Sequence, residues 1–372
     1  MMIKQTYPMV LVDSNSHAKE VLAELSKRCP FVSPISEKDK ELFQSYFVAA
    51  MADLPVGEGY GYSWAYITQM AHGRAYGQPL GLKYYNPEKQ LLVPLSYFAR
   101  PASSQTEWHF HLVRPMGLWQ TDQFFELCNL LYELSQSPVY IKKIRDDEEM
   151  DLLKRPGFSL AERYPWHDNA FLEDDTKAEV IIDVNHTLSF LTRSGDNELK
   201  RKYRNFFRRN QQICWQRYNV RNESLCRDAE SVVKQFMEYP QVKALGLSRF
   251  DDFSNMLSSL PLGINGKDYF SAVLYIANQP AGFYMAEHLG QKQIAGVYAN
   301  IALRDKFRYS SEYLLLELLQ DLHQAGIAVA NLGGSETDGL HKFKMKFRRS
   351  QGTVKEMRWV VFDGQHHYYN KR

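Results

Sequence analysis

The sequence predicts an α+β protein made of two similar halves. The same order of elements occurs twice: an antiparallel meander, a helix, a strand, a second helix and a last strand. Between the halves, residues 171–178 (FLEDDTKA) are polar and acidic, which is typical of a domain boundary. We therefore expect lobes at residues 1–175 and 176–372, each with a mixed, mainly antiparallel sheet flanked by helices. The halves share no visible sequence identity, so the repeat is one of architecture.

The composition is that of a folded protein with a large core. Of 372 residues, 44% are hydrophobic, 24% are charged and 13% are aromatic, which excludes a disordered chain. Because the net charge is only +2, any affinity for nucleic acid must come from a local patch. The four cysteines have neither metal-ligand nor disulfide spacing, so we expect reduced thiols in a cytoplasmic protein. No apolar run reaches the roughly 18 residues that a membrane span needs.

The first half begins with a helix and an aromatic segment. Residues 36–51 carry apolar side chains at helical spacing, which predicts a docking helix. In residues 60–67 no stripe of cations alternates with the aromatics, which favours core packing over a platform for stacked bases. Two predicted strands follow at residues 81–85 and 90–98, separated by a turn at residues 86–89.

Residues 108–113 (WHFHLV) predict a further strand, with His109 and His111 on one face. Glu107 would share that face, and such a trio is able to ligate a metal ion. Alternating polar residues also describe the wet side of a sheet, so we favour a structural role and expect no metal site. The first half then continues with a helix at 121–135, a strand at 139–144, a helix at 146–154 and a strand at 158–164.

The second half repeats this order. Its predicted strands lie at residues 180–184, 269–276, 281–288, 294–299, 327–330 and 355–362. A helix is predicted over residues 310–324, with Ser310 as its N-cap and Glu312 in its first turn. Gly326 lies where a glycine is expected after the last turn of a helix.

A glycine turn and a lysine-bearing helix follow the strand at residues 327–330. Gly333 and Gly334 allow the backbone to bend sharply and to lie close to a ligand. The helix then presents apolar residues on one face, at Leu340, Phe343 and Phe347. Its lysines are Lys342 and Lys346 on the opposite face and Lys344 beside the apolar face. The pattern fits a ligand site, and it fits a sheet edge with a solvated helix equally well.

A basic segment lies between the halves, at residues 194–218. Four residues keep helical phase there: Leu199, Tyr203, Phe206 and Cys214. Six cations fall within ten residues, namely Lys200, Arg201, Lys202, Arg204, Arg208 and Arg209. Charge runs are usually solvated helix faces. We nevertheless favour a surface for phosphates of RNA, a nucleotide or an anionic lipid, because arginine grips phosphate in a bidentate way.

The second half resembles the GNAT-type acyltransferase fold, in the branch of the Fem-type aminoacyl transferases and the catalytic domain of phosphatidylglycerol lysyltransferases. Four stretches carry the resemblance: NELKRKYRNFFRRNQQ, the meander ending in VYANIAL, YSSEYLLLELLQDLHQAGIAVANLGGS, and GLHKFKMKF, which is similar to the family's GL-x-x-FK-x-x-F. The similarity is clear over residues 176–360 and weaker before them. It implies a tandem GNAT-like protein whose active site lies in the second lobe, near the place where the lobes meet.

The resemblance also implies roles for individual residues. Lys344 matches the functional lysine of the FK motif and would stabilise the oxyanion formed during acyl transfer. Phe343 and Tyr298 would shape the pocket, and Gly333, Gly334 and Ser335 would line it. Donor phosphates would contact Arg201, Lys202, Arg204, Arg308 and Ser310. Glu336 and Asp338 are candidate general bases, although Glu336 also fits an ordinary surface acid.

The family transfers an aminoacyl group from aminoacyl-tRNA, or an acyl group from coenzyme A, to an amine or hydroxyl. Coenzyme A users have a glycine-rich loop before the central helix, whereas residues 304–311 (RDKFRYSS) contain no glycine. This difference favours a tRNA-borne or carrier-borne donor; of the two we favour aminoacyl-tRNA, and we expect a tRNA partner and no bound cofactor. Two alternatives stay open, a coenzyme-A-dependent N-acyltransferase and a non-catalytic module that binds RNA or a partner protein. The acceptor is a small molecule, a peptide or a lipid headgroup.

Overall fold

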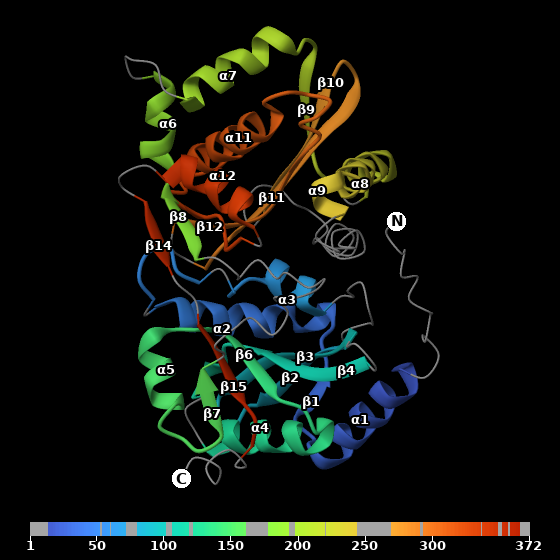
Figure 1. Cartoon of the computed structure of the whole chain (residues 1–372). Helices are drawn as coiled ribbons and strands as arrows, with labels where there is room; N and C mark the ends of the chain where they lie inside the picture. The colour runs from blue at the N-terminus through green and yellow to red at the C-terminus, as the bar shows by residue number, and fades with distance from the viewer. Residues whose placement is uncertain are drawn as a thin grey trace, which may run out of the picture.

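The computed structural model describes residues 14–52, 54–59, 61–71, 80–101, 106–118, 122–160, 178–192, 198–219, 221–243, 269–290, 293–335, 337–348, 352–355 and 358–364. These residues form two lobes, one above the other in Figure 1, each built on its own sheet. The expected boundary at 171–178 lies almost wholly outside the described residues.

The first lobe has a sheet between two layers of helices. Its strand order is β1 (Val32–Pro34), β2 (Leu80–Asn86), β3 (Leu91–Pro101), β4 (Thr106–Val113), β6 (Val139–Ile144), β15 (Arg358–Phe362) and β7 (Phe158–Leu160), with β5 (Met116–Gly117) paired to β3. Below the sheet in Figure 1 lie α1 (Ser14–Arg28) and α4 (Asp122–Ser135). Above it, towards the second lobe, lie α2 (Lys40–Ala52), which follows the short 3-10 helix η1 (Glu37–Asp39), and α3 (Trp64–Ala71). The short helix α5 (Asp146–Leu152) connects β6 to β7.

The second lobe has a sheet with the order β14 (Thr353–Lys355), β8 (Glu179–Asp183), β13 (Val329–Asn331), β12 (Ile294–Ala302), β11 (Gln279–His288), β10 (Tyr269–Ile276) and β9 (Ile213–Arg217). One face is covered by α11 (Ser310–Gln324), which also contacts α6 (Val184–Thr192) and α7 (Glu198–Arg209). The helix α12 (Asp338–Arg348) lies beside them, and α8 (Glu223–Met237) and the short α9 (Pro240–Lys243) lie on the other side of the sheet.

The predicted repeat is present in the structure. An antiparallel meander, a helix and a strand parallel to the last meander strand occur as β2–β3–β4–α4–β6 and again as β10–β11–β12–α11–β13. In each lobe the parallel pair, β4 with β6 or β12 with β13, lies in the interior of the sheet. The α+β fold class with two lobes is therefore confirmed.

Three expectations were wrong. The last predicted strand is two strands, because β14 pairs with β8 in the second sheet whereas β15 enters the first sheet between β6 and β7. Cys214 does not continue the basic helix, since α7 ends at Arg209 and Cys214 lies in β9. Ser310 is not the N-cap of α11: Tyr309 takes that place with φ +70°, and Ser310 is the first helical residue.

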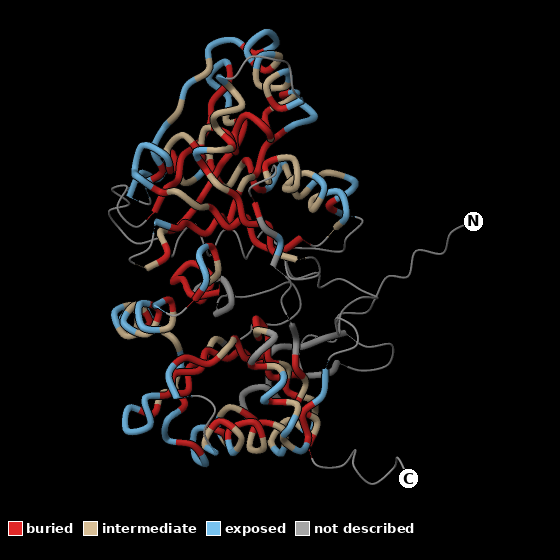
Figure 2. Tube along the Cα trace, turned by 90° about the vertical axis from the view of Figure 1, so that its left-hand side faces the viewer, coloured by how far each residue is buried: buried red, intermediate tan, exposed pale blue. Residues whose placement is uncertain are grey.

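The core of the second lobe extends into the α2 and α3 layer of the first lobe, whose own sheet and lower helices enclose a separate core. Phe43 and Phe47 of α2 belong to the same buried cluster as Phe283 and Leu314 of the second lobe. Figure 2 shows that buried residues fill the inside of both lobes. Polar groups also cross the junction, because the buried carboxylate of Glu287 accepts hydrogen bonds from the first backbone N–H groups of α3. The lobes are therefore packed as one body along the layer formed by α2 and α3.

Candidate active site at the lobe junction

The glycine turn after β13 is fixed against the neighbouring strand β8. The side-chain oxygen of the fully buried Asn331 accepts a hydrogen bond from the Gly333 N–H at 2.8 Å. Gly333 adopts φ +70°, a left-handed conformation that favours glycine. Val180 of β8 bonds the backbone of this turn twice, to Leu332 at 2.8 Å and to Gly333 at 3.2 Å. The turn is thus held at three points, which gives its carbonyl groups fixed directions.

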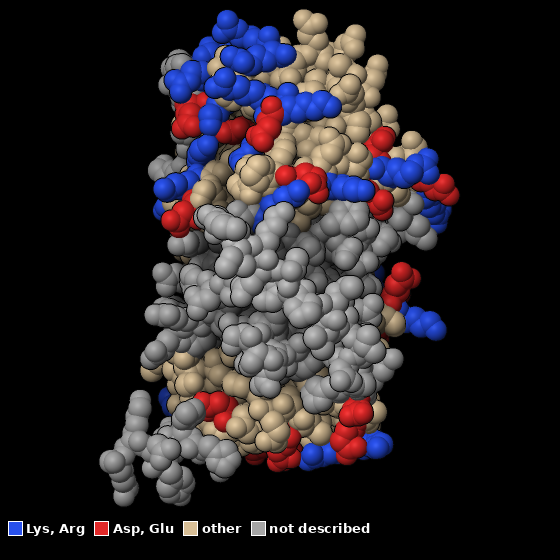
Figure 3. All heavy atoms as spheres, turned by 45° about the vertical axis from the view of Figure 1, so that its right-hand side comes forward, with Lys and Arg blue, Asp and Glu red and all other residues tan. Residues whose placement is uncertain are grey.

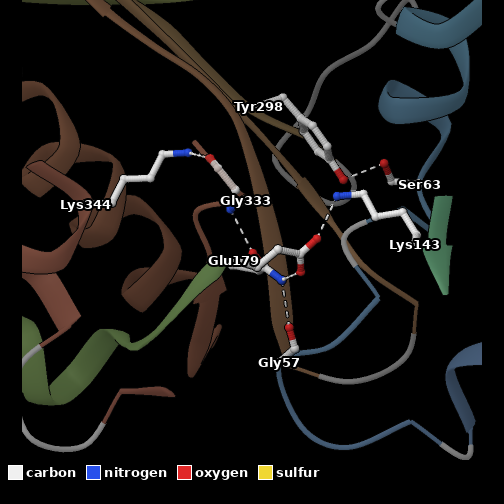
Figure 4. Close-up of polar contacts among 9 residues, drawn as sticks. Gly57, Ser63, Lys143, Glu179, Tyr298, Gly333 and Lys344 are labelled. Carbon is white, nitrogen blue, oxygen red and sulfur yellow. Dashed lines mark hydrogen bonds and ion pairs between the residues drawn. The ribbon is translucent and has the colours of Figure 1, made fainter. Parts of the chain in front are cut away.

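Lys344 points at this turn. Its ammonium group donates a hydrogen bond to the carbonyl oxygen of Gly334, and its side chain is half-buried (Figure 4). The helix α12 is anchored by Phe347, which is fully buried and whose carbonyl accepts a hydrogen bond from the Thr187 hydroxyl at 2.9 Å. The structure therefore brings Lys344, Gly333 and Gly334 together, as the sequence predicted.

The other residues predicted for this region differ in how deeply they are buried. Ser335 is fully buried. Phe343 is half-buried, and its ring lies 5.4 Å from that of Phe347 and 5.7 Å from the Lys346 ammonium. Asp338 is exposed and begins α12. Glu336 lies outside the described residues.

Tyr298 lies at the junction, away from Lys344. It is an extra residue in β12, because the pairing with β11 skips it between Val297 and Ala299. Its hydroxyl donates a hydrogen bond to Ser63 of the first lobe, and in Figure 4 the side chains of Tyr298 and Lys344 approach the strands from different sides. Burial, together with the negative charge of Glu287, raises the pKa of Tyr298 well above its ordinary value. Tyr298 is therefore a neutral hydrogen-bond donor that joins the lobes.

The basic helix α7 carries the predicted cationic surface. Leu199 and Phe206 face inward, and the Phe206 ring stacks on Tyr313 of α11 at 3.9 Å. Four arginines of the helix are exposed: Arg201, Arg204, Arg208 and Arg209. Figure 3 shows Lys and Arg gathered at the top of the second lobe, where α7 lies in Figure 1. This patch is available to a polyanion.

Lys202 has a different environment from its neighbours. Its ammonium lies 2.6 Å from the buried carboxylate of Glu312 and 2.9 Å from Glu198. Lys346 of α12 also reaches Glu312, at 3.3 Å. Burial alone would lower the pKa of Lys202, but these carboxylates raise it above its ordinary value. Lys202 therefore links α7 to α11, and the two carboxylates already compensate its positive charge.

The start of α11 combines cations with a buried hydroxyl. The guanidinium groups of Arg308 and Arg209 lie 5.1 Å and 5.8 Å from the centre of the Tyr309 ring. Ser310 is fully buried, and its hydroxyl oxygen has no hydrogen-bond partner in the described part of the chain. Arg209 of α7 and the predicted residues Arg308 and Ser310 are thus brought to one end of α11.

The loop before α11 uses its own backbone donors. Four of its N–H groups donate hydrogen bonds to backbone carbonyls of the same segment. The donors are the N–H groups of Arg304, Lys306, Phe307 and Ser310. The N–H of Asp305 faces the Tyr239 hydroxyl at 3.4 Å. A loop of this kind has few free N–H groups with which to hold a pyrophosphate.

Neither a metal cluster nor a membrane helix occurs within the described ranges. No group of three His, Cys, Asp or Glu residues is placed to hold a metal ion there. His109 and His111 are buried, and their rings lie 5.5 Å and 5.3 Å from the ring of Tyr140. No helix in these ranges is long and apolar enough to cross a membrane.

Comparison with known proteins shows the fold. No family model and no curated protein matches the chain. Solved structures do match, among them a conserved protein of unknown function from Bacteroides thetaiotaomicron (TM-score 0.62, 10% identity, 89% of this chain and 99% of the other). FemX also matches, with a TM-score of 0.53 and 9% identity, over 90% of this chain and 97% of the other. The C-terminal domain of a putative lysylphosphatidylglycerol synthetase from Agrobacterium fabrum matches with a TM-score of 0.52 and 12% identity, over 88% of this chain and 92% of the other. The chain has a tandem GNAT-like fold. The resemblance to Fem-type and lysylphosphatidylglycerol enzymes is thereby confirmed for the fold.

Sequence reasoning missed the polar residues with which this tandem GNAT-like chain joins its lobes. Lys143 of β6, Glu179 of β8 and Asn331 of β13 are buried and hydrogen-bonded to one another. One signal was available, because VYIKKI places two lysines in succession within a strand, and a regular strand would turn one of them towards the buried face. Beside them lies a pocket of about 360 Å³ that includes open solvent; its lining includes Tyr62, Arg114, Lys143, Arg145 and Glu179.

Proposed function

We propose that the protein transfers an aminoacyl group from an aminoacyl-tRNA to an amine or hydroxyl acceptor. The observation that carries this proposal is the placement of Lys344, whose ammonium is held at the glycine turn where β12 and β13 separate. The strands pair only as far as Gly296 and Asn331, and β12 then continues without β13. A substrate carbonyl bound beside this turn would lie within reach of the ammonium.

Aminoacyl transfer from an ester requires stabilisation of a developing negative charge and needs no covalent enzyme intermediate. The acceptor nitrogen or oxygen attacks the ester carbonyl, and the carbonyl oxygen becomes an oxyanion. A positioned ammonium stabilises that charge, and an interaction of this kind is worth roughly 10²- to 10³-fold in rate. The ester bond to the ribose oxygen then breaks, and the proton lost by the acceptor goes to that oxygen. Asp338 is our candidate for carrying this proton, since it is exposed at the start of α12.

The donor is inferred from the contrast between α7 and the loop before α11. The exposed arginines of α7 suit the phosphates of an RNA backbone. The loop at residues 304–310 has no glycine and uses most of its N–H groups internally, which disfavours the pyrophosphate of coenzyme A. The similar structure named for lysylphosphatidylglycerol synthesis agrees with aminoacyl transfer as the reaction class and with a lipid headgroup as one acceptor.

Donor binding is tested with purified protein, bulk charged tRNA and acetyl-coenzyme A at two salt concentrations. We expect salt-sensitive tRNA binding that weakens about tenfold in Arg201→Ala/Arg204→Ala, with the salt slope reduced by about 2. The control is Arg227→Ala, which removes an exposed arginine from α8 on the other side of the sheet. Saturable binding of acetyl-coenzyme A without tRNA binding would overturn the donor assignment in favour of a coenzyme-A-dependent acyltransferase.

Catalysis is tested by following loss of the aminoacyl ester in the presence of hydroxylamine, a surrogate acceptor. We expect Lys344→Met to lower the enzyme-dependent rate by about 10²- to 10³-fold. Lys342→Met is the matched control, because Lys342 is exposed on the same helix, two residues away. If Lys344→Met retained the wild-type rate within a few fold, Lys344 would have no role in charge stabilisation.

A further inference from the structure

A continuous set of buried hydrogen bonds connects the first lobe to the turn that holds Lys344. The Lys143 ammonium donates to one oxygen of Glu179 at 2.8 Å. The other oxygen of Glu179 accepts from the Asn331 amide at 2.8 Å, and that amide also donates to the Gly57 carbonyl at 3.0 Å. The Asn331 oxygen holds the Gly333 N–H, and the next residue, Gly334, accepts from Lys344 (Figure 4).

The Lys143–Glu179 pair is almost completely removed from water. The two side chains are 3% and 2% exposed. Burying two charges costs so much hydration that a pair of apolar residues of similar size usually gives an equally stable protein. Stability alone is therefore a weak reason for the pair. The geometry of the pair gives a better reason. One carboxylate oxygen of Glu179 bonds Lys143 of the first lobe and the other bonds Asn331 of the second lobe, so Glu179 fixes the relative position of the lobes.

The backbone of Lys143 is shaped for this contact. Adjacent residues of a regular strand point to opposite faces, yet the ammonium groups of Lys142 and Lys143 both lie 5.4 Å from the Tyr66 ring. Lys143 breaks the alternation because its φ is +64°, a left-handed value that is unfavourable for a residue other than glycine. Such strain persists where the surroundings impose it, often at functional sites.

We propose that Lys143 is a positioning residue through which the first lobe sets the catalytic turn of the second. Lys143 orients Glu179, Glu179 orients the Asn331 amide, and Asn331 fixes the Gly333–Gly334 turn against which Lys344 rests. The first lobe thus contributes to the reaction without touching the donor at α7. This inference rests on the proposed role of Lys344.

The test compares Lys143→Met with Lys143→Met/Glu179→Gln. The single variant leaves a buried carboxylate without its cation, so we expect kcat for the surrogate reaction to fall by about 10- to 100-fold. The KM for aminoacyl-tRNA should stay within about twofold, because the interaction acts on the turn and not on donor binding. The double variant has no unpaired charge and keeps an acceptor oxygen for Asn331, so activity should largely return.

A readout independent of activity is hydrogen exchange of the Gly333 amide. We expect it to exchange at least about tenfold faster in Lys143→Met and to be protected again in the double variant. The control is Lys142→Met, since Lys142 is the adjacent, equally buried lysine over the same ring. Unchanged exchange in Lys143→Met, or an equal loss of activity in Lys142→Met, would overturn the proposal. If no variant and no wild-type protein transferred an aminoacyl group, the proposed function would fail, while the exchange data would still decide whether Lys143 holds the turn.

Discussion

At the scale of single residues, Gly296 sets the position of Tyr298. A Cβ atom at Gly296 would lie 2.5 Å from the Tyr298 hydroxyl oxygen and 2.9 Å from the ring carbon that bears it. Neither distance is compatible with a real side chain, so only glycine allows the tyrosine to fold back over its own strand and reach Ser63.

We therefore expect Gly296→Ala to destabilise the protein by about 1–3 kcal/mol, because it overpacks a buried site. Gly339→Ala is the control, since a Cβ there meets its nearest neighbour, Thr337, at 3.8 Å. That change should be neutral or stabilising by about 0.5–1 kcal/mol, because alanine has the better helix propensity. Urea unfolding of the two variants measures both effects, and equal stabilities would contradict the steric argument.

Single residues were predictable where chemistry and local spacing coincide. Lys344 and the two glycines are close in sequence, so one turn and one helix are enough to bring them together. Lys202 was predicted to bind phosphate, and the structure pairs it with Glu312, which is 110 residues away along the chain. No local pattern reports such a partner. The same limitation hides Lys143 and Glu179, which come from different lobes.

At the scale of elements, α7 is mounted on α11 by aromatic rings around a half-buried acid. Tyr203 of α7 and Gln320 of α11 each donate a hydrogen bond to Glu317 at 3.1 Å. Burial raises the pKa of the Glu317 carboxyl, and the nearby charge of Asp321 adds to the effect. The folded protein therefore holds a proton on Glu317 more tightly than the unfolded chain does.

This environment predicts a dependence of stability on pH. When folding raises the pKa of a carboxyl group, the protonated group stabilises the folded state. This stabilisation is complete at pH values below the unfolded-state pKa of about 4.3, and it is lost as the pH rises through the folded-state pKa. Glu317→Gln should remove this loss and stabilise the protein at pH 7 by up to about 1 kcal/mol. Glu223→Gln, which neutralises an exposed carboxyl of α8, controls for the loss of one negative charge. A wild-type stability that rises between pH 4 and pH 7 relative to Glu317→Gln would contradict the prediction.

Elements were predicted well from their own sequences and poorly from their pairing. The meander strands and α11 lie close to their expected ranges, because alternation and helical period are local signals. The expected strand at 355–362 contained the right residues for β15, but its neighbours in space come from the other lobe. Hydrophobic pattern identifies a strand without naming the sheet that will receive it.

At the scale of the whole molecule, β15 ties the end of the second lobe into the first. Phe362 is fully buried there, with its ring 4.9 Å from the ring of Phe158 and 5.7 Å from the ring of Phe125.

We expect Phe362→Ala to lower the free energy of unfolding by about 3–5 kcal/mol, as large-to-small changes of buried aromatics do. Amide hydrogen exchange should become faster in β6 and β7, because β15 pairs with both, although Phe362 follows the second lobe in sequence. Val354→Ala in β14 is the control, because Val354 is 38% exposed, and faster exchange confined to the second lobe would show that β15 does not support the first.

The position of β15 also has a consequence for synthesis on the ribosome. Of the two strands that border it, β7 pairs with no other strand in the described parts of the chain. The residues of β15 are added nearly 200 positions after β7, which at ordinary elongation rates is a delay of about 10 to 40 seconds. During that time β6 presents an open edge, a surface that invites pairing with other chains and that chaperones can cover. A chain released before β15 is made would lack the partner of β6 and would keep that edge of its first sheet open.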